Sequence, residues 1–391
     1  MGILSNTVSF LQYQVVGELP PGEPAEWAAP LLAKNAFVAI DNSSEESSSG
    51  WASLDDPQRV DFSENRDFFR PPYLSFSLRR DQRRVPAAVL RQHLERAEEE
   101  FLAAHPGLQR APKDKREELR ENVKGALLAR TLPTPSLYDA VWDIERGILT
   151  FTGTNGKIAE IFEGHFRQTF DGLRLVALHP VARAREVIPE ALRPVLDKEN
   201  KATTDAVLEQ IQENTWLGAD FLRWLLARTV SGRSNFQVRR DGPAAQKENF
   251  IAFLDNRLLL AAGPQRVAVA GPQDHYREPR IALETGKEIA EATIFMEKGE
   301  DAWKTTLKGE QFLFRSFKAP SVKLEKDDIT DEQSEREAIF YERMHVLAEG
   351  LQLFDSLLAD FLEERLADDW PRRNQEMQEV LGLDREDEPN E

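Results

Sequence analysis

Apolar and polar residues alternate with two different periods along the chain, and these periods predict both strands and helices. A period of two is typical of half-buried strands, and it predicts strands over residues 6–17, 73–80, 141–143, 148–151, 172–178, 250–254, 257–262, 265–271, 291–299, 302–309 and 310–317. A period near 3.6 predicts helices over residues 24–37, 86–104, 112–132, 158–166, 203–229, 277–290 and 340–361. The serine-rich segment 40–51 is interpreted as a loop. The mixture contains no repeat and predicts an α+β fold with mixed sheets and packed helices.

The longest regular pattern lies near the carboxyl end of the chain. Apolar residues recur there at spacings of four and three without a break, namely Phe340, Met344, Leu347, Leu351, Phe354, Leu358 and Phe361. Such a heptad-like seam is typical of a long helix. It favours a packing face within the chain, and a coiled coil with a partner is the alternative.

The predicted helix that begins at Pro112 has three sectors when its residues are placed about 100° apart. The apolar sector holds Leu119, Val123 and Ala126, the basic sector beside it holds Lys113, Arg116, Arg120 and Lys124, and the acidic sector opposite holds Glu117, Glu118 and Glu121. Like charges four residues apart cost a helix roughly 0.2–0.5 kcal/mol per pair. The basic row therefore indicates either a binding face or a solvated face whose bases pair with the glutamates.

Length and composition set the outer limits of the interpretation. With 391 residues, 41% of them hydrophobic, the chain can bury a large core in two or three domains. We expect an amino-terminal α+β region over 1–182, a central region with a β meander over 183–326, and a long helix with an acidic tail over 327–391. The absence of cysteine excludes disulfides and thiolate metal sites. No run of 18 apolar residues occurs, so we expect a cytoplasmic protein without a membrane partner.

Charge is segregated along this acidic chain. The net charge is −18, yet residues 327–391 alone hold 21 acidic and six basic residues. Residues 79–130, in contrast, hold 13 basic and nine acidic residues, and they include Arg79, Arg80, Arg83 and Arg84 within six positions. The isoelectric point of the whole chain is therefore a poor guide to its partners.

The usual catalytic motifs are absent from the sequence. The six histidines form no His-Glu-x-x-His pair, and no Gly-x-Ser-x-Gly motif occurs. The stretch "GTGTNGK" lacks phosphate-loop spacing and indicates a turn. Asp274 and Glu278 are the nearest approach to the converging carboxylates of a magnesium-dependent nuclease. No metal or other cofactor is expected, and a nuclease site at these two carboxylates is kept as the alternative.

Two long segments resemble the RdgC family of recombination-associated proteins. The first runs from "YLSFSLRRDQRRVPAAVLRQHL" through "APKDKREELRENVKGALLARTLPTPSLYDAVWDIERGILTFTG" to "GLRLVALHP". The second contains "IALETGKEIAEATIFMEKGEDAWKTTLKGEQFLFRSF" and "EREAIFYERMHVLAEGLQLFDSLLADFLEERL". Together they cover residues 70–180 and 278–366, about half of the chain.

The resemblance implies a bacterial, nucleoid-associated protein that forms a homodimeric ring around double-stranded DNA. In the family the ring does not read sequence, its inside is basic, and it restrains the loading of a recombinase. A basic lining holds a duplex through its phosphates, which supply one charge per about 1.7 Å of axis. This arrangement would reconcile the basic cluster with the acidic total.

Carried over by position, the resemblance implies a set of DNA contacts and one gate residue. The implied phosphate contacts are Arg79, Arg80, Arg83, Arg84, Lys113, Lys115, Arg116, Arg120 and Lys124. Leu132 falls where the family places an apolar residue that closes the dimer gate.

The chain also departs from the family pattern in three places. It has "AGPQDHYRE" where family members carry a lysine-rich finger, an extra stretch at 183–250, and the acidic tail. Arg233, Arg239 and Arg240 are candidates to replace the finger. A metal-dependent exonuclease, or an interaction protein that does not bind DNA, remains the alternative function.

Overall fold

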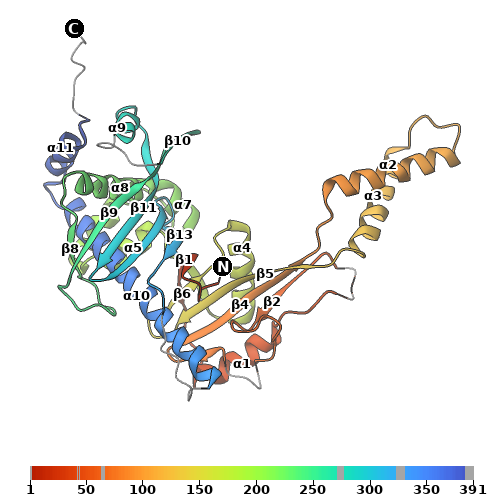
Figure 1. The fold of residues 1–391 in the computed structure, drawn as a ribbon, viewed down its shortest axis with the longest axis horizontal. Helices are drawn as coiled ribbons and strands as arrows, with labels where there is room; N and C mark the ends of the chain where they lie inside the picture. Colours follow the sequence, from red (N-terminus) through yellow and green to blue (C-terminus); the bar gives the residue numbers. More distant parts are fainter. Residues whose placement is uncertain are drawn as a thin grey trace, which may run out of the picture. The chain divides into compact units, whose positions relative to one another are not determined.

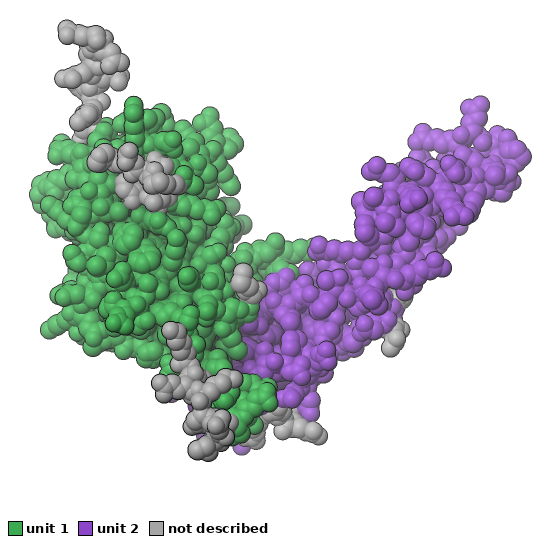
Figure 2. All heavy atoms as spheres, viewed as in Figure 1, with its two compact units in different colours: residues 1–16, 147–159, 175–391 green, residues 17–146, 160–174 purple. Residues whose placement is uncertain are grey.

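The chain forms two compact units, each assembled from segments that are distant in sequence. The computed structural model describes residues 2–41, 43, 45–62, 67–270, 277–322 and 331–383. Unit 1 combines residues 1–16, 147–159 and 175–391, and unit 2 combines residues 17–146 and 160–174 (Figure 2). The predicted α+β class is confirmed. The three regions 1–182, 183–326 and 327–391 follow chain order and stay a prediction.

Unit 1 is built on an antiparallel sheet (Figure 1). Its strands lie in the order β10 (Gln265–Val269), β9 (Asn249–Ala262), β11 (Glu288–Lys298), β12 (Asp301–Lys308), β13 (Leu313–Lys318), β1 (Thr7–Val16) and β6 (Ile148–Phe151). β8 (Asn235–Gln237) pairs with β9, and β7 (Arg174–Ala177) pairs with β1. The predicted strands 250–254 and 257–262 are one strand, because a register shift opposite β11 absorbs the polar residues between them.

Unit 1 contains the helices α5 (Pro180–Val187), η1 (Glu190–Leu192), α6 (Arg193–Glu199), α7 (Val207–Glu213), α8 (Thr215–Val230), α9 (Arg277–Glu284), α10 (Glu332–Arg365) and α11 (Trp370–Leu381). Helices α8, α9 and α10 contact strands of its sheet, and other helices of the unit pack on these helices or on one another. The predicted helix 203–229 is divided at Asn214, whose side chain bonds to the backbone N–H of Lys201 and to Asn200. These bonds compete with helix continuation.

The long helix α10 lies in the core of unit 1. Asp331 caps its first turn by accepting from the backbone N–H groups of Gln333 and Ser334. Six of the seven seam residues are buried, and residues on other faces are buried as well. The prediction of a packing face within the chain is confirmed.

Unit 2 has a smaller antiparallel sheet. Its central strand β4 (Tyr73–Gln82) pairs with β5 (Thr134–Asp143), β2 (Ser47–Ala52) and β3 (Phe69–Arg70). The interpretation of 40–51 as a loop is wrong for its second half, which forms most of β2. Buried Trp51 anchors that strand, and Gly50 lets its backbone lie directly against Phe37.

Aromatic residues fill the core of unit 2 between its sheet, α1 (Pro24–Lys34) and most of α4 (Gly156–Thr169). Trp51 meets Phe76 at 5.0 Å and Phe162 at 5.8 Å between ring centres, and Trp142 meets Phe166 at 5.8 Å. Edge-to-face aromatic pairs of this kind stabilise the fold beyond the effect of burying their apolar surface. These ring contacts hold the part of the sheet that carries Trp51 and Trp142 against α4.

A hairpin of two helices extends from the other end of this sheet (Figure 1). It consists of α2 (Ala87–Ala104), which follows β4, and α3 (Lys113–Leu128), which precedes β5. The two helices pack on each other. Nevertheless no residue of α2 is buried, and Leu128 is the one buried residue of α3.

Candidate nucleic-acid interface

Arg79 lies on one face of β4 together with Asp81, because side chains two residues apart share a face of a strand. Its guanidinium donates to both carboxylate oxygens of Asp81 at 2.9 and 2.8 Å and to the Pro57 carbonyl at 3.0 Å. It also lies 4.2 Å from the centre of the Phe37 ring. The hydrogen bond with Asp81 raises the pKa of Arg79. Acceptors within unit 2 therefore already hold this cation.

Arg83 continues the same face and is buried, with 3% of its surface exposed. Its two terminal nitrogens donate to backbone carbonyls at 2.6–3.2 Å, those of Ile40, Asp41, Ser43 and Glu45. Arg83 therefore fastens the residues before β2 to β4. In this arrangement Arg83 holds the backbone before β2 in place, and its buried guanidinium is not available to a ligand.

Arg80 and Arg84 differ from Arg79 and Arg83 in their hydrogen-bond and ion-pair partners. Arg80 is half-buried on the opposite face of β4, directly between Ser49 of β2 and Ser136 of β5. Arg84 is exposed, and its Nε donates to Gln82 Oε1 at 3.1 Å. Among the described residues neither arginine forms an ion pair, so both can accept an anion as partner.

Three cations of the basic sector of α3 are unpaired in the part of the chain that the structure describes. They are Lys113 and Arg120, which are exposed, and Arg116, which is half-buried. Arg116 and Arg120 are one helical turn apart, about 6 Å along the axis. That separation is close to the spacing of successive phosphates on a DNA strand.

The other two predicted contacts on α3 are engaged in surface ion pairs. Lys115 Nζ lies 2.6 Å from Glu118 Oε1, and Lys124 Nζ lies 3.0 Å from Glu46 Oε2. Exposed pairs are worth roughly 0–1 kcal/mol, so a polyanion can replace either glutamate at little cost. The Lys124–Glu46 pair also places the basic sector on the side of α3 nearest the start of β2.

Leu132 lies between α3 and β5 and is 82% exposed. Leu137, on β5, is 42% exposed. The apolar sector of α3 is itself only half-buried at Leu119 and Val123, and Ala126 is exposed. The hairpin and its junction with the sheet therefore leave apolar surface open.

The arginines proposed to replace the missing finger behave differently from one another. Arg239 pairs with Asp360 at 2.8 Å and Glu363 at 2.6 Å. Arg240 donates to the carbonyls of Val187 and Glu186. Arg233 is exposed and has no side-chain hydrogen bond or ion pair among the described residues. Two of the three are thus occupied within unit 1.

Of the two carboxylates in the alternative nuclease site, the structure describes only Glu278. Glu278 is exposed in the first turn of α9, whereas Asp274 lies outside the described residues. Across the described ranges no group of three or more histidine, aspartate or glutamate side chains could hold a metal ion.

The polar neighbours of Arg80 were not predicted from the sequence. Ser49 Oγ lies 2.8 Å from His165 Nε2 on α4, and burial lowers the pKa of His165. The alternation of Ser47, Ser49 and Trp51 is the signal that could have revealed β2, but the surrounding serines concealed it.

The comparison with protein families decides the identity of this arrangement. A family model described as "Putative exonuclease, RdgC" matches residues 16–215, about half of the chain. The chain belongs to the RdgC family. The match includes the segment from β4 through the α2–α3 hairpin to β5, and this segment contains the nine predicted DNA contacts and Leu132. No curated protein matches the chain.

RdgC membership confirms the resemblance seen in the sequence and supports a recombination-associated role. No helix among the described residues is both long enough and apolar enough to cross a bilayer.

Proposed function

We propose that this RdgC-family chain binds double-stranded DNA without sequence preference. The observation that carries the proposal is the row of cations Lys113, Arg116 and Arg120 on α3, which form no ion pair with any described residue. An exposed helix in an acidic chain gains nothing for its own stability from such a row. Its energetic benefit appears only when an anion with regularly spaced charges lies along it.

The other predicted contacts divide into residues that contact phosphates and residues that support them. Arg80, Arg84, Lys115 and Lys124 contact phosphates after little or no rearrangement. Arg79 and Arg83 support the strand and the preceding residues from which those groups project. Contacts to phosphates position a duplex but do not read bases. The protein should therefore bind unrelated duplexes with similar affinity.

The assembly that we propose is a homodimeric ring in which Leu132 takes part in the gate. The support is the open apolar surface of Leu132 and of the α3 sector, which a second copy can cover. A ring held on DNA would restrain recombinase loading by occupying the duplex. In the cell such a protein would be nucleoid-associated.

Charge reversal on α3 tests the DNA interface. Arg116→Glu with Arg120→Glu should weaken duplex binding at least several-fold, and the salt slope should fall by about 0.9 for each phosphate that is no longer neutralised. Gel-shift titrations at several salt concentrations measure both quantities. The matched control is Arg91→Glu with Arg96→Glu on α2, which should have a clearly smaller effect. An unchanged slope in the α3 variant would remove this helix from the interface.

A charged residue at the gate tests the assembly. Leu132→Glu should alter self-association without unfolding the chain, because the side chain is already exposed. Light scattering, together with binding to linear and circular DNA, measures the change. Leu208→Glu on α7 is the control, since Leu208 is 67% exposed and far from the hairpin in sequence. Wild-type behaviour of the Leu132 variant on both DNA forms would refute the gate.

The name of the family keeps a nuclease as the second candidate function. Binding in magnesium-free buffer followed by addition of magnesium distinguishes the two functions. Intact strands support a binding protein, and shortened strands support an exonuclease.

A further inference from the structure

Unit 1 contains an open hollow of about 280 Å³ between α8, the end of α10 and α11. Four arginines line it, Arg228, Arg233, Arg372 and Arg373, together with two glutamates, Glu364 and Glu376. Its apolar wall is formed by Trp224, Ala227, Met377 and Val380. The lining is therefore a basic rim around an apolar surface.

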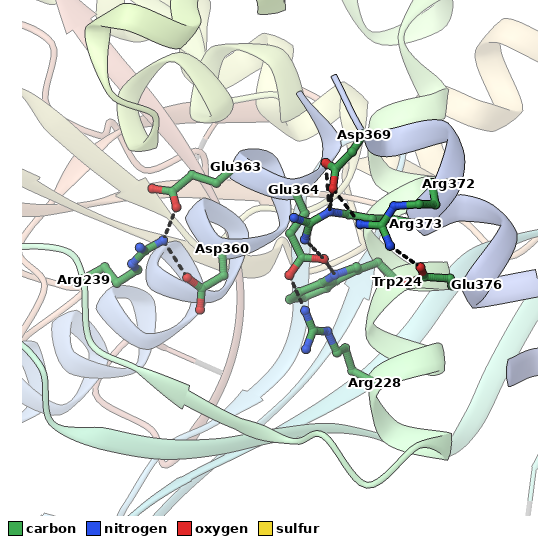
Figure 3. A network of polar contacts seen from close by, with 10 residues as sticks. All are labelled: Trp224, Arg228, Arg239, Asp360, Glu363, Glu364, Asp369, Arg372, Arg373 and Glu376. Carbon is green, nitrogen blue, oxygen red and sulfur yellow. Dashed lines mark hydrogen bonds and ion pairs between the residues drawn. The ribbon is translucent and has the colours of Figure 1, made fainter. Parts of the chain in front are cut away.

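Three carboxylates, those of Glu364, Glu376 and Asp369, pair with three of the four arginines. Glu364 pairs with Arg228 and accepts from the Trp224 indole at 3.1 Å, and Arg373 approaches it at 3.5 Å. Figure 3 shows Arg228 and Arg373 converging on Glu364 from two helices. Arg373 also pairs with Asp369 at 2.9 Å, so Arg228 and Arg373 both already have carboxylate partners within unit 1.

The outer side of the hollow has spare hydrogen-bond donors. Arg372 is bound to Glu376 at 2.6 Å and Asp369 at 3.0 Å, but its side chain remains 66% exposed. Arg233, just beyond α8, is exposed and unpaired among the described residues. A guanidinium presents five donors in a planar fork, so both arginines can bind carboxylates from solvent.

The helix α11 runs along the hollow and leads directly into the acidic end of the sequence. Arg372 is near its start and Val380 near its end, a distance of about 12 Å along the axis. The described chain ends at Leu383, and residues 384–391, "DREDEPNE", hold five acidic residues and one basic residue. Eight extended residues reach about 26 Å. The segment is therefore long enough to return along α11 to both outer arginines.

We propose that the hollow is a docking site for the acidic segment 384–391 of the same chain. The carboxylates of the segment bind Arg233 and Arg372 at the rim. Its close attachment to α11 raises the effective concentration of the segment to about the millimolar range. Weak individual contacts then suffice for occupancy. The proposal does not depend on DNA binding, because every group involved belongs to unit 1.

Competition with a free peptide tests the proposal. A fluorescent peptide with the sequence of residues 383–391 is titrated against the full chain and against a chain that ends at Leu383. The shortened chain should bind the peptide about tenfold more tightly, since its hollow is empty. Raising the salt concentration should weaken the binding, because the rim contacts are ionic.

Charge reversal at the rim locates the peptide. In the shortened chain, Arg233→Glu should weaken peptide binding about fivefold, whereas Arg266→Glu on β10 should leave it unchanged. Arg266 is also exposed and lies outside the hollow, so it controls for net charge. Circular dichroism of both variants excludes unfolding as the cause.

Each possible result decides for or against the proposal. Equal affinity of the two chains would overturn occupancy by the chain's own segment, as would binding that is insensitive to Arg233→Glu. If the competition disappears on dilution of the full chain, the segment of a second copy fills the hollow, and docking within one chain is wrong.

Discussion

The α2–α3 hairpin of unit 2 and the helix α10 of unit 1 have similar apolar periodicity but opposite burial. α10 buries residues on several faces, including Arg343, Gln352 and Ser356. The hairpin buries almost nothing beyond Leu128. Periodicity therefore shows that a helix has an apolar side, but it does not show what covers that side.

The difference lies in the surroundings of the apolar side chains. Phe354 of α10 meets rings from α8 and from the strand region, with Phe221 at 5.7 Å and Phe314 at 5.0 Å. α3, which carries Leu119, packs mainly on the neighbouring helix α2 among the described elements, and Leu119 stays half-buried. A pair of helices alone cannot enclose an apolar seam, so the hairpin is suited to contact something outside its own unit.

Truncation of one apolar residue in each region gives the largest expected contrast. Phe354→Ala should lower the free energy of unfolding by about 3–5 kcal/mol, because it empties a closed core. Leu119→Ala should cost about 1 kcal/mol or less in the isolated chain, since much of its side chain is already exposed. Urea unfolding measures both. Similar losses of stability would mean that the hairpin is packed as tightly as α10.

Glycine substitution should change stability in opposite directions in the two regions. A Cβ at Gly350 of α10 would lie 2.4 Å from the Trp303 ring and 2.9 Å from Phe317. At Gly125 of α3 nothing lies within 4 Å. Gly350→Ala should therefore destabilise by about 1–3 kcal/mol, whereas Gly125→Ala should stabilise by up to about 1 kcal/mol through helix propensity. Thermal melting of both variants checks the signs.

A smaller effect is expected from Asp360 of α10, whose ionisation makes the stability of the fold depend on pH. Burial raises the pKa of Asp360 to about 6, with Glu363 acting in the same direction and Arg239 against it. The folded state then binds a proton more tightly than the unfolded state, so ionisation of Asp360 costs stability. The stabilisation from its proton is present below about pH 4 and is lost as the pH rises through about 6.

Asp360→Asn removes this pH dependence. Between about pH 7.5 and 5.5 the wild type should gain roughly 0.5–1 kcal/mol relative to the variant. The difference between the two proteins is the quantity to measure, because His179 acts in the opposite direction. Its pKa is lowered to about 4 by burial, with Arg185 adding to the effect. Parallel pH curves would show that Asp360 is effectively solvated.

Much of the fold was predictable because local patterns agree with the tertiary structure. The strands β1, β4 and β11–β13 and the helix α10 follow their apolar periods. The secondary-structure predictions were wrong where polar residues lie within strands. Ser47 and Ser49 form β2 because β4 supplies their partners, and the polar middle of β9 is absorbed by a register shift.

The predicted site was harder to judge than the fold. Side chains alternate between the two faces of β4, so the sequence places Arg80 on the opposite face from Arg79. It also places Asp81 on the same face as Arg79, where the two side chains can form an ion pair. The acceptors of Arg83 are backbone carbonyls about 40 residues away, which carry no signal in the side-chain sequence. Whether an arginine is available to a ligand thus depends on contacts that periodicity does not encode.

The interleaving of the units also sets the order in which the chain can fold during synthesis. Unit 2 is complete once residue 174 has emerged, whereas β1 must wait for β13, with Thr7 opposite Lys318. At translation rates of about 5–20 residues per second, that wait is about 15–60 s. During this time the apolar strand β1 has an open edge, which other chains can pair with. Among the described strands, β1 therefore waits longest for its partner, and its open edge is exposed to wrong pairing during that time.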